Sequence, residues 1–540
     1  MGKEAFDRAV AEVERLLASG ALDASLEAIE RHLSNNPRDW NFWSYAAGVW
    51  IDAGSAKSDL LLVDRGIDFI ENVYKSTSVP RDAYPDLLYN LANGYGARYP
   101  LLLKMGRDNE ASEALQREKH LLQEVLLDRN ALSPNLLPLA MTNYANALDH
   151  LGRTVEAVDG YYDCLQIAPD HAVAMGNCGN ALQNLFNVDP HHNPAILYES
   201  WRLLTAAAER PHRIRELAGY YAVDHYRRSL AKTEELAAKV IPGGVPGLSK
   251  WADERQSACP GWAPDPELER IVADRLFLTV NPSPEKCPAD LRDDVFFRKM
   301  SVPLSDVENK RLASLAHALN QIKEDFATAR YLYYQSQRED EPVSRVSLLT
   351  DYADVYDYAQ FGLRSGFLKA SFRVAADCMD KVAGLMNSYF ELGHPEDRVA
   401  FGNVWYAQLS RDRGLHPALE RKLLTHRNLR ALQDVSRDWF VQSYPAPLKD
   451  LRNAATHRRL VLYWMGPTDG AREDTEQGLE SFGWVVLFVL RQVRAAVLYL
   501  VGVIQAEEQE LSNSRGGRVA PMRFHVGPAR ADQHLHRGGQ

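Results

Sequence analysis

The chain reads PLKDLRNAATHRRLVLYW from Pro447 to Trp464. This stretch is typical of the beginning of a helix, because Asp450 places a carboxylate near the free amides and the positive end of the helix dipole. A helix turns about 100° per residue, so Asn453 and His457 share a face. Arg452 lies on an adjacent face, and its side chain is long enough to curl toward His457. The stretch combines a permanent cation with an imidazole that can gain or lose a proton.

These three side chains suit the cleavage of RNA without a metal ion. A ribose 2′-OH needs a base before it attacks the adjacent phosphate, the leaving 5′ oxygen needs an acid, and the crowded phosphate needs positive charge. His457 can be the base or the acid, Arg452 can hold the phosphate through its fork of donors, and Asn453 can orient either one. One motif supplies a single histidine, so the chemistry favours a homodimer. We predict no cofactor and no bound metal.

The spacing alone leaves a structural explanation open, because Arg-x4-His occurs at two other places, Arg411/His416 and Arg421/His426. The first is interrupted by a glycine and followed by a proline, as expected of a loop. The second is the real competitor, since it is helical in pattern and close by. On spacing alone, a solvated basic helix face is an alternative to a catalytic site.

The run Arg452-Asn453-x3-His457, at the start of a late helix in an all-helical region, resembles the signature of HEPN-domain ribonucleases. Further segments within residues 305–465 resemble, in the same order, one bacterial HEPN subgroup whose members carry an N-terminal helical-repeat region. These segments are His317–Lys323, Ala329–Ser336, Tyr358–Ser365, Leu368–Phe390, Asn403–Tyr406 and Asn428–Leu432.

The resemblance implies an endoribonuclease whose paired motifs form a composite site in a dimer, and a toxin or defence role in bacteria. Some HEPN toxins carry a tyrosine two residues after the histidine. This chain has Arg459 there, so control by modification of that tyrosine is not expected. From general site logic, Asp380 is a candidate to orient His457, as a third group orients a catalytic base.

Length, charge and cysteine usage limit the class of protein. At 540 residues the chain exceeds one ordinary domain, and its net charge of −10 excludes a generally basic coat, so any RNA contact must be local. Five scattered cysteines show no zinc spacing, and the N-terminus lacks an apolar signal core. These features predict a cytoplasmic protein.

Residues 1–240 are helical in pattern and contain an internal repeat. Asn143–Leu148 (NYANAL) recurs as Asn177–Leu182 (NCGNAL) at an offset of 34 residues, which is the tetratricopeptide period. Gly152 marks the turn of this unit, and small residues let its paired helices approach. The sequence therefore predicts a tetratricopeptide-like helical-hairpin array.

Arrays of this kind form a curved surface that commonly binds peptides or docks domains. Asn146 and Asn180 occupy equivalent positions near the expected concave face, where they either bind a partner's backbone or are ordinary exposed polar residues. Asp189–His192 (DPHH) is expected to be a polar loop rather than a metal site, because adjacent histidines rarely bind one ion together. A peptide or protein partner on the array is a prediction.

The predicted fold class is all-α, and three regions follow the array. Residues 241–303 are rich in Pro and Gly and are expected to be an ordered connector. Residues 304–510 are expected to form a HEPN-like bundle, and residues 511–540 a basic disordered tail. The candidate helices of the bundle are 305–336, 364–391, 418–443, 448–465 and 474–512.

Two conspicuous stretches have structural explanations. Trp484–Ile504 is very apolar, but Arg491 and Arg494 would each cost roughly 2.5–3.5 kcal/mol at a bilayer centre. We expect a buried bundle helix or part of a dimer interface, and no membrane. Tyr331–Tyr334 offers rings on which bases could stack, but core or interface packing is the expected role.

Three hypotheses follow. The first is a metal-independent endoribonuclease that acts on RNA and is governed by the N-terminal repeats. The second is a non-catalytic repeat scaffold or RNA-binding protein, and a weaker third is a peptide-binding regulator. A buried, structurally paired His457 would favour the second hypothesis.

Overall fold

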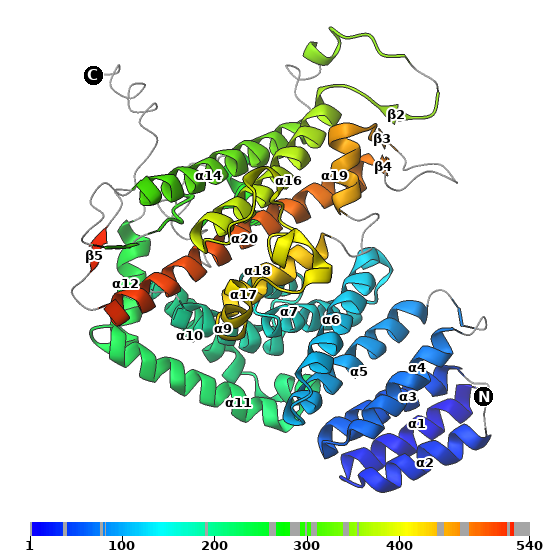
Figure 1. Cartoon of the computed structure of the whole chain (residues 1–540). Coiled ribbons are helices and arrows are strands. Elements are labelled where there is room, and N and C mark those ends of the chain that lie inside the picture. The colour runs from blue at the N-terminus through cyan, green and yellow to red at the C-terminus, as the bar shows by residue number, and fades with distance from the viewer. Residues whose placement is uncertain are drawn as a thin grey trace. The chain divides into compact units, whose positions relative to one another are not determined.

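The computed structural model is predominantly helical, which confirms the all-α fold class (Figure 1). The chain forms two compact units, the first made of Met1–Leu151, Ala157–Cys178 and His212–Ala218, and the second of Gly152–Glu156, Gly179–Pro211 and Gly219–Gln540. The predicted domain boundaries at 240, 303 and 510 stay a prediction. The structure describes residues 3–35, 40–75, 79–80, 83–188, 193–258, 266–280, 292–297, 300–303, 310–338, 345–353, 356–439, 448–464, 475–515 and 519–522.

The N-terminal region is a helical array, consistent with repeats. The Asp59 side chain caps α4 by accepting from the amides of Leu61 and Leu62. Gly66 lets α3 and α4 approach closely, because a Cβ there would lie 2.9 Å from the Ala47 carbonyl oxygen. The tetratricopeptide relationship itself stays a prediction. The helices are α1 (Lys3–Ala18), α2 (Leu22–Asn35), α3 (Trp40–Lys57), α4 (Leu60–Tyr74), α5 (Tyr84–Lys104), α6 (Asp108–Val125), the 3₁₀ helix η2 (Leu126–Ala131), α7 (Leu136–His150) and α8 (Thr154–Ile167).

The repeated asparagines are engaged within the protein. The Oδ1 atom of Asn146 accepts from the Tyr161 hydroxyl (2.7 Å) and from Nδ2 of Asn177 (2.7 Å). Asn180 Nδ2 lies 3.0 Å from Nε2 of His225. These amides therefore hold helices together, and a partner on the array remains a prediction. Residues Asp189–His192, for which a polar loop is expected, lie outside the described residues.

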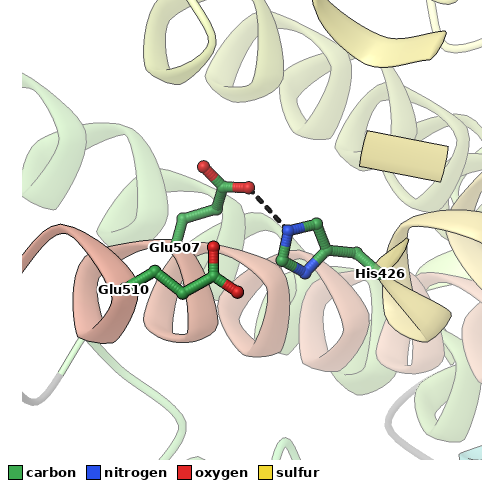
Figure 2. Close-up of side chains that lie close together, drawn as sticks. All are labelled: His426, Glu507 and Glu510. Atoms are coloured by element: carbon green, nitrogen blue, oxygen red, sulfur yellow. Dashed lines mark ion pairs between the residues drawn. The ribbon is translucent and has the colours of Figure 1, made fainter. Parts of the chain in front are cut away.

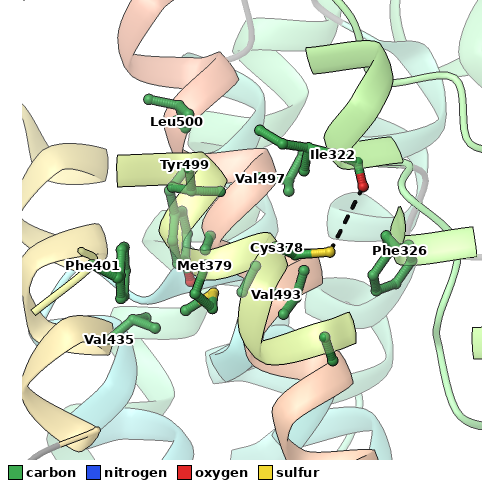
Figure 3. Packing of buried hydrophobic residues seen from close by; sticks show 14 of the residues in the cluster. Ile322, Phe326, Cys378, Met379, Phe401, Val435, Val493, Val497, Tyr499 and Leu500 are labelled. Atoms are coloured by element: carbon green, nitrogen blue, oxygen red, sulfur yellow. Dashed lines mark hydrogen bonds between the residues drawn. The ribbon is translucent and has the colours of Figure 1, made fainter. Parts of the chain in front are cut away.

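The core of the HEPN-like region lies between α14, α16 and α20 (Figure 3). The Cys378 thiol on α16 is buried and lies 3.9 Å from the Ile322 carbonyl oxygen on α14. Burial raises the pKa of this thiol to about 12, so it is inert packing rather than a nucleophile. The remaining helices are α9 (Ala172–Val188), α10 (Pro194–Ala208), α11 (Pro211–Val240), α12 (Gly244–Ala258), α13 (Pro266–Ala273), α14 (Lys310–Ser336), α16 (Leu363–Tyr389), η5 (Glu396–Arg398), η6 (Ala407–Leu409), η7 (Arg411–Arg413), α17 (Pro417–Thr425), α18 (Arg427–Asp438), α19 (Leu448–His457) and α20 (Leu479–Arg515).

The α20 helix confirms the prediction of a buried bundle helix. Its residues Leu479–Asn513 are long and apolar enough to cross a membrane, but 83% of the most apolar window is buried inside the protein. Arg491 Nε donates to the Asp274 carbonyl (3.1 Å), and Arg494 Nε donates to the Phe277 carbonyl (2.8 Å). The two arginines thus fasten α20 to the connector, where Phe277 is buried.

A buried ion cluster lies within the second unit. Arg153 is fully buried, and its Nη1 atom lies 2.9 Å from Asp434 Oδ2 and 2.5 Å from Asp438 Oδ2, both on α18. Its Nε atom donates to Glu156 (2.8 Å). Gly152, just before it, has a φ of 88° and a Cβ there would lie 2.8 Å from the Arg427 carbonyl oxygen. Only glycine fits this position without displacing the backbone of residue 427.

Short strands depart from the purely helical prediction. The strand β1 (Met300–Pro303) pairs antiparallel with β5 (Val519–Met522), with Met300 opposite Met522. The strand β3 (Val461–Tyr463) pairs antiparallel with β2 (Ala359–Gln360) and parallel with β4 (Glu476–Gly478). The predicted helix 448–465 is therefore wrong beyond His457, where the chain turns into β3. The tail expected to be disordered contributes β5, and residues 516–518 and 523–540 lie outside the described part.

Candidate functional site

The α19 helix presents the predicted motif at its carboxyl end. Leu451 and Ala454 are buried against the bundle, which fixes the face of the helix that points inward. Arg452 and Asn453 are half-buried, whereas His457, the last residue of the helix, is exposed. The predicted i, i+4 relation of Asn453 and His457 is thus realised on an ordered helix that is anchored by its apolar side.

Arg452 is held by two carboxylates of α16. Its Nη2 atom lies 2.7 Å from Asp380 Oδ2 and 3.3 Å from Asp377 Oδ1. Asp380 is fixed in turn, because its Oδ1 atom accepts from the Phe401 amide (2.9 Å). The hypothesis that Asp380 orients His457 is therefore not supported, since this carboxylate holds the guanidinium instead. The guanidinium also reaches these carboxylates rather than curling toward His457.

His457 is open to a ligand. Among the described residues, neither its imidazole nor the Asn453 amide makes a side-chain hydrogen bond or ion pair. The backbone on both sides of His457 is ordered, because α19 ends there and β3 begins at Val461. The site thus combines an accessible imidazole with a guanidinium that is partly exposed (32%).

The family comparison covers this part of the chain. The family model described as LA2681-like HEPN matches residues 307–507. Residues 307–507 form an LA2681-like HEPN domain. The resemblance inferred from the sequence is confirmed, and Arg452, Asn453 and His457 all lie inside the matched range. No curated protein matches the chain. A HEPN domain suggests a function in RNA cleavage or nucleotide chemistry.

The competing motif of the HEPN domain lies in a different environment (Figure 2). His426 joins α17 to α18, and its Nε2 atom lies 2.7 Å from Oε1 of Glu507 on α20. Both side chains are only 11–12% exposed. Lys422 forms an ion pair with the second oxygen of Glu507. His426 therefore fastens the α17–α18 junction to α20 and has little room for a substrate.

The same cluster has donors of the kind that bind divalent cations. One ligand atom each from His426, Glu507 and Glu510 lies within 4.8 Å of the others. Imidazole and carboxylate suit several transition metals. However, the Lys422 ammonium already pairs with Glu507, so we assign a structural role to the cluster.

The third motif is also structural. The Nδ1 atom of His416 accepts from the Ala418 amide (3.3 Å) and caps α17, while its ring packs against His394 with centroids 5.2 Å apart. Sequence reasoning missed Asp377, the second carboxylate on Arg452. The spacing Asp377-x2-Asp380 places both on one face of a helix, but the partner of that face was not apparent from the sequence.

Proposed function

We propose that this protein is a metal-independent endoribonuclease. The observation that carries the proposal is the exposed imidazole of His457 in the HEPN domain, one helical turn and a half after a guanidinium that Asp380 orients. An accessible imidazole and a permanent cation supply the proton transfer and the charge stabilisation that cleavage of a phosphodiester needs.

In the proposed reaction, one His457 takes the proton of a ribose 2′-OH, and the 2′ oxygen forms a bond to the adjacent phosphorus. The bond from phosphorus to the 5′ oxygen breaks, and a second His457 gives a proton to that oxygen. Arg452 stabilises the charge that develops on the phosphate, and Asn453 orients the substrate or the imidazole. The products are a 2′,3′-cyclic phosphate and a free 5′-OH.

Two histidines per reaction require two copies of the chain, since each copy supplies one. We therefore propose a homodimer, formed through the HEPN domains, in which the two copies of α19 face each other. The helical array would bind a peptide or protein that governs cleavage, and the protein would act in the cytoplasm as a toxin or defence effector.

The second candidate is a non-catalytic scaffold or RNA-binding protein. The observation that favours it is the double ion pair of Arg452, because a guanidinium that is occupied by Asp377 and Asp380 has fewer donors for a phosphate. Under the first proposal, Asp380 only positions the Arg452 guanidinium, and the exposed part of that guanidinium binds the phosphate.

The test is the cleavage of a mixed RNA pool in EDTA by the full-length protein and by His457→Ala. The proposal predicts cleavage by the wild type alone, with 2′,3′-cyclic phosphate ends. If neither protein cleaves, the assay is repeated with cell extract as a source of a trigger. Absence of cleavage in both conditions would favour the scaffold.

A further inference from the structure

A group of aromatic side chains is exposed beside the candidate site. Four exposed aromatic residues lie on the segment from Tyr352 to Phe361, and a fifth is Trp464, the residue after β3. We call them together the aromatic face: Tyr352, Tyr356, Tyr358, Phe361 and Trp464, with exposed fractions from 49% to 89%. Contiguous exposed apolar patches on folded proteins usually mark the site of a ligand or partner. The face therefore needs an explanation.

The aromatic face is built on the sheet that follows α19. The rings of Tyr352 and Phe361 stack, with centroids 5.8 Å apart and planes at 19°. The Trp464 amide donates to the Tyr358 carbonyl (3.1 Å), which extends the pairing of β2 with β3. Because β3 begins four residues after His457, the aromatic face is close in sequence to the candidate catalytic residue.

A row of cations leads from the aromatic face toward Arg452. Lys369 Nζ lies 5.8 Å from the centroid of the Phe361 ring, and Arg373 follows one turn later on α16. Burial and the nearby Arg373 charge lower the pKa of Lys369. Within the described residues, no carboxylate pairs with either cation. Asp377, the next residue at this spacing, contacts Arg452.

The path along α16 from Lys369 to Asp377, the carboxylate that contacts Arg452, is long enough for a short stretch of a nucleic-acid strand. It covers eight residues, which corresponds to about 12 Å at 1.5 Å per residue. Unpaired bases stack on aromatic rings, and the backbone phosphates bind adjacent cations. In double-stranded RNA the bases are already stacked on one another and cannot use the rings.

A second copy of the chain is the competing occupant, and Leu348 and Leu349, each 82% exposed, would suit it. However, the centres of protein interfaces are depleted in lysine, although aromatic residues and arginine are enriched there. Here Lys369 lies over a ring of the face, with Arg373 beside it. Two neighbouring cations without a carboxylate partner fit a polyanion better than a copy of the same surface.

We propose that the aromatic face, with Lys369 and Arg373, binds an unpaired RNA strand and leads it along α16 to Arg452. This inference rests on the proposed function, since it names single-stranded RNA as the substrate of the same site. The Tyr331–Tyr334 run does not form a second stacking surface, because Tyr333 and Tyr334 are buried, the Tyr334 hydroxyl donates to Asp274 (2.8 Å), and only the Tyr331 ring is exposed.

The test measures binding separately from cleavage. A fluorescein-labelled 2′-O-methyl RNA strand lacks the attacking hydroxyl, so its anisotropy reports affinity for the intact full-length protein. Phe361→Ala should weaken binding of the single strand roughly fivefold or more, the equivalent of one lost stacking contact. The wild type should bind the same strand, annealed to its complement, more weakly than the free strand.

The cations are tested by salt dependence. Lys369→Gln/Arg373→Gln should reduce the slope of log affinity against log salt by about 1.4, since each phosphate contact on a single strand contributes about 0.7. The matched controls are Tyr221→Ala, an exposed ring on α11, and Arg228→Gln/Lys232→Gln, an exposed pair with the same spacing. Neither control should change affinity or slope.

The outcomes separate this inference from the proposed function. Unchanged binding in Phe361→Ala and in the double variant overturns the inference, even if His457→Ala still abolishes cleavage. Loss of binding in both variants supports the inference, even if no condition gives cleavage. If Phe361→Ala instead converts a dimer to a monomer in light scattering and keeps its RNA affinity, the face is an interface between copies and the inference is wrong.

Discussion

The two helical Arg-x4-His motifs of the HEPN domain have the same spacing and opposite surroundings. His457 ends α19 in an exposed position, and its partner Arg452 is oriented by Asp380. His426 lies between α17 and α18. Its side chain is nearly buried and forms an ion pair with Glu507. The difference teaches that access, which depends on the neighbouring residues, separates a candidate catalytic imidazole from a structural one when the spacing is the same.

The sharpest test of this comparison is His457→Ala. We expect cleavage to fall by about 10²–10⁴-fold, because general acid–base catalysis contributes that much, while the melting temperature stays unchanged since the side chain is exposed. Cleavage rates and thermal unfolding are the measurements. His212→Ala, another exposed histidine on a helix, is the control and should keep full activity. Equal losses of cleavage in His457→Ala and His212→Ala would show that His457 has no specific role in catalysis.

The next largest effect is expected for Arg452→Ala. Loss of the cation at the phosphate should lower the cleavage rate by roughly 10²–10³-fold, as for removal of a donor to a developing oxyanion. Arg452→Lys should fall between the two, because it keeps the charge but loses the fork. Single-turnover rates on one labelled RNA measure both variants. An alanine variant that cleaves at the wild-type rate would show that the phosphate is held by other residues.

A smaller effect is expected for Asp380→Asn, which removes the charge that orients Arg452. Loss of one such contact, worth about 0.5–1.5 kcal/mol, should lower the cleavage rate by about 2- to 13-fold. Asp377→Asn is the matched control, and its effect should be smaller because that contact is longer (3.3 Å) and Asp377 is more exposed. Faster cleavage by Asp380→Asn would mean that the carboxylate restrains the guanidinium rather than positions it.

The smallest effect on cleavage is expected for His426→Ala. The rate per folded molecule should stay within about twofold of the wild type, while stability falls by about 1–3 kcal/mol because Glu507 loses a buried partner. Thermal unfolding and the cleavage rate are compared in the same samples. A large loss of cleavage without a loss of stability would move the site to this motif.

Local features of the site were predictable from the sequence, whereas its neighbours were not. The helix around Asn453 and His457 followed from spacing and helix propensity, and the HEPN resemblance was confirmed by the family match. The sequence placed helix as far as residue 465, because an apolar run such as Leu460–Trp464 suits a buried helix as well as a strand. Residues 461–463 form a strand because they pair with β2 and β4. Such pairing joins segments that are distant in the sequence, so local sequence patterns do not predict it.

The same limit applies to the contacts of α16 and α17. The sequence shows Asp377 and Asp380 only as two acidic residues of one helix. Their contact with Arg452 depends on the packing of α19 against α16. The predicted helix 418–443 is divided because His426 adopts an extended conformation (φ −98°, ψ 104°), although no Gly or Pro marks the break. Its ion pair with a residue 81 positions later supports this conformation.

Arg153 bears on how this protein can be divided. A fragment that begins at residue 304 contains Asp434 and Asp438 but lacks the guanidinium that lies 2.9 Å and 2.5 Å from them. Removing one partner of a buried ion pair is costly, because the other charge stays away from water. We expect α18 to shift in such a fragment. Because α18 packs on α20 in the HEPN domain, the shift would also affect α20. A fragment that begins before Gly152 keeps this guanidinium and its carboxylates together, whereas a fragment that begins at residue 304 separates them.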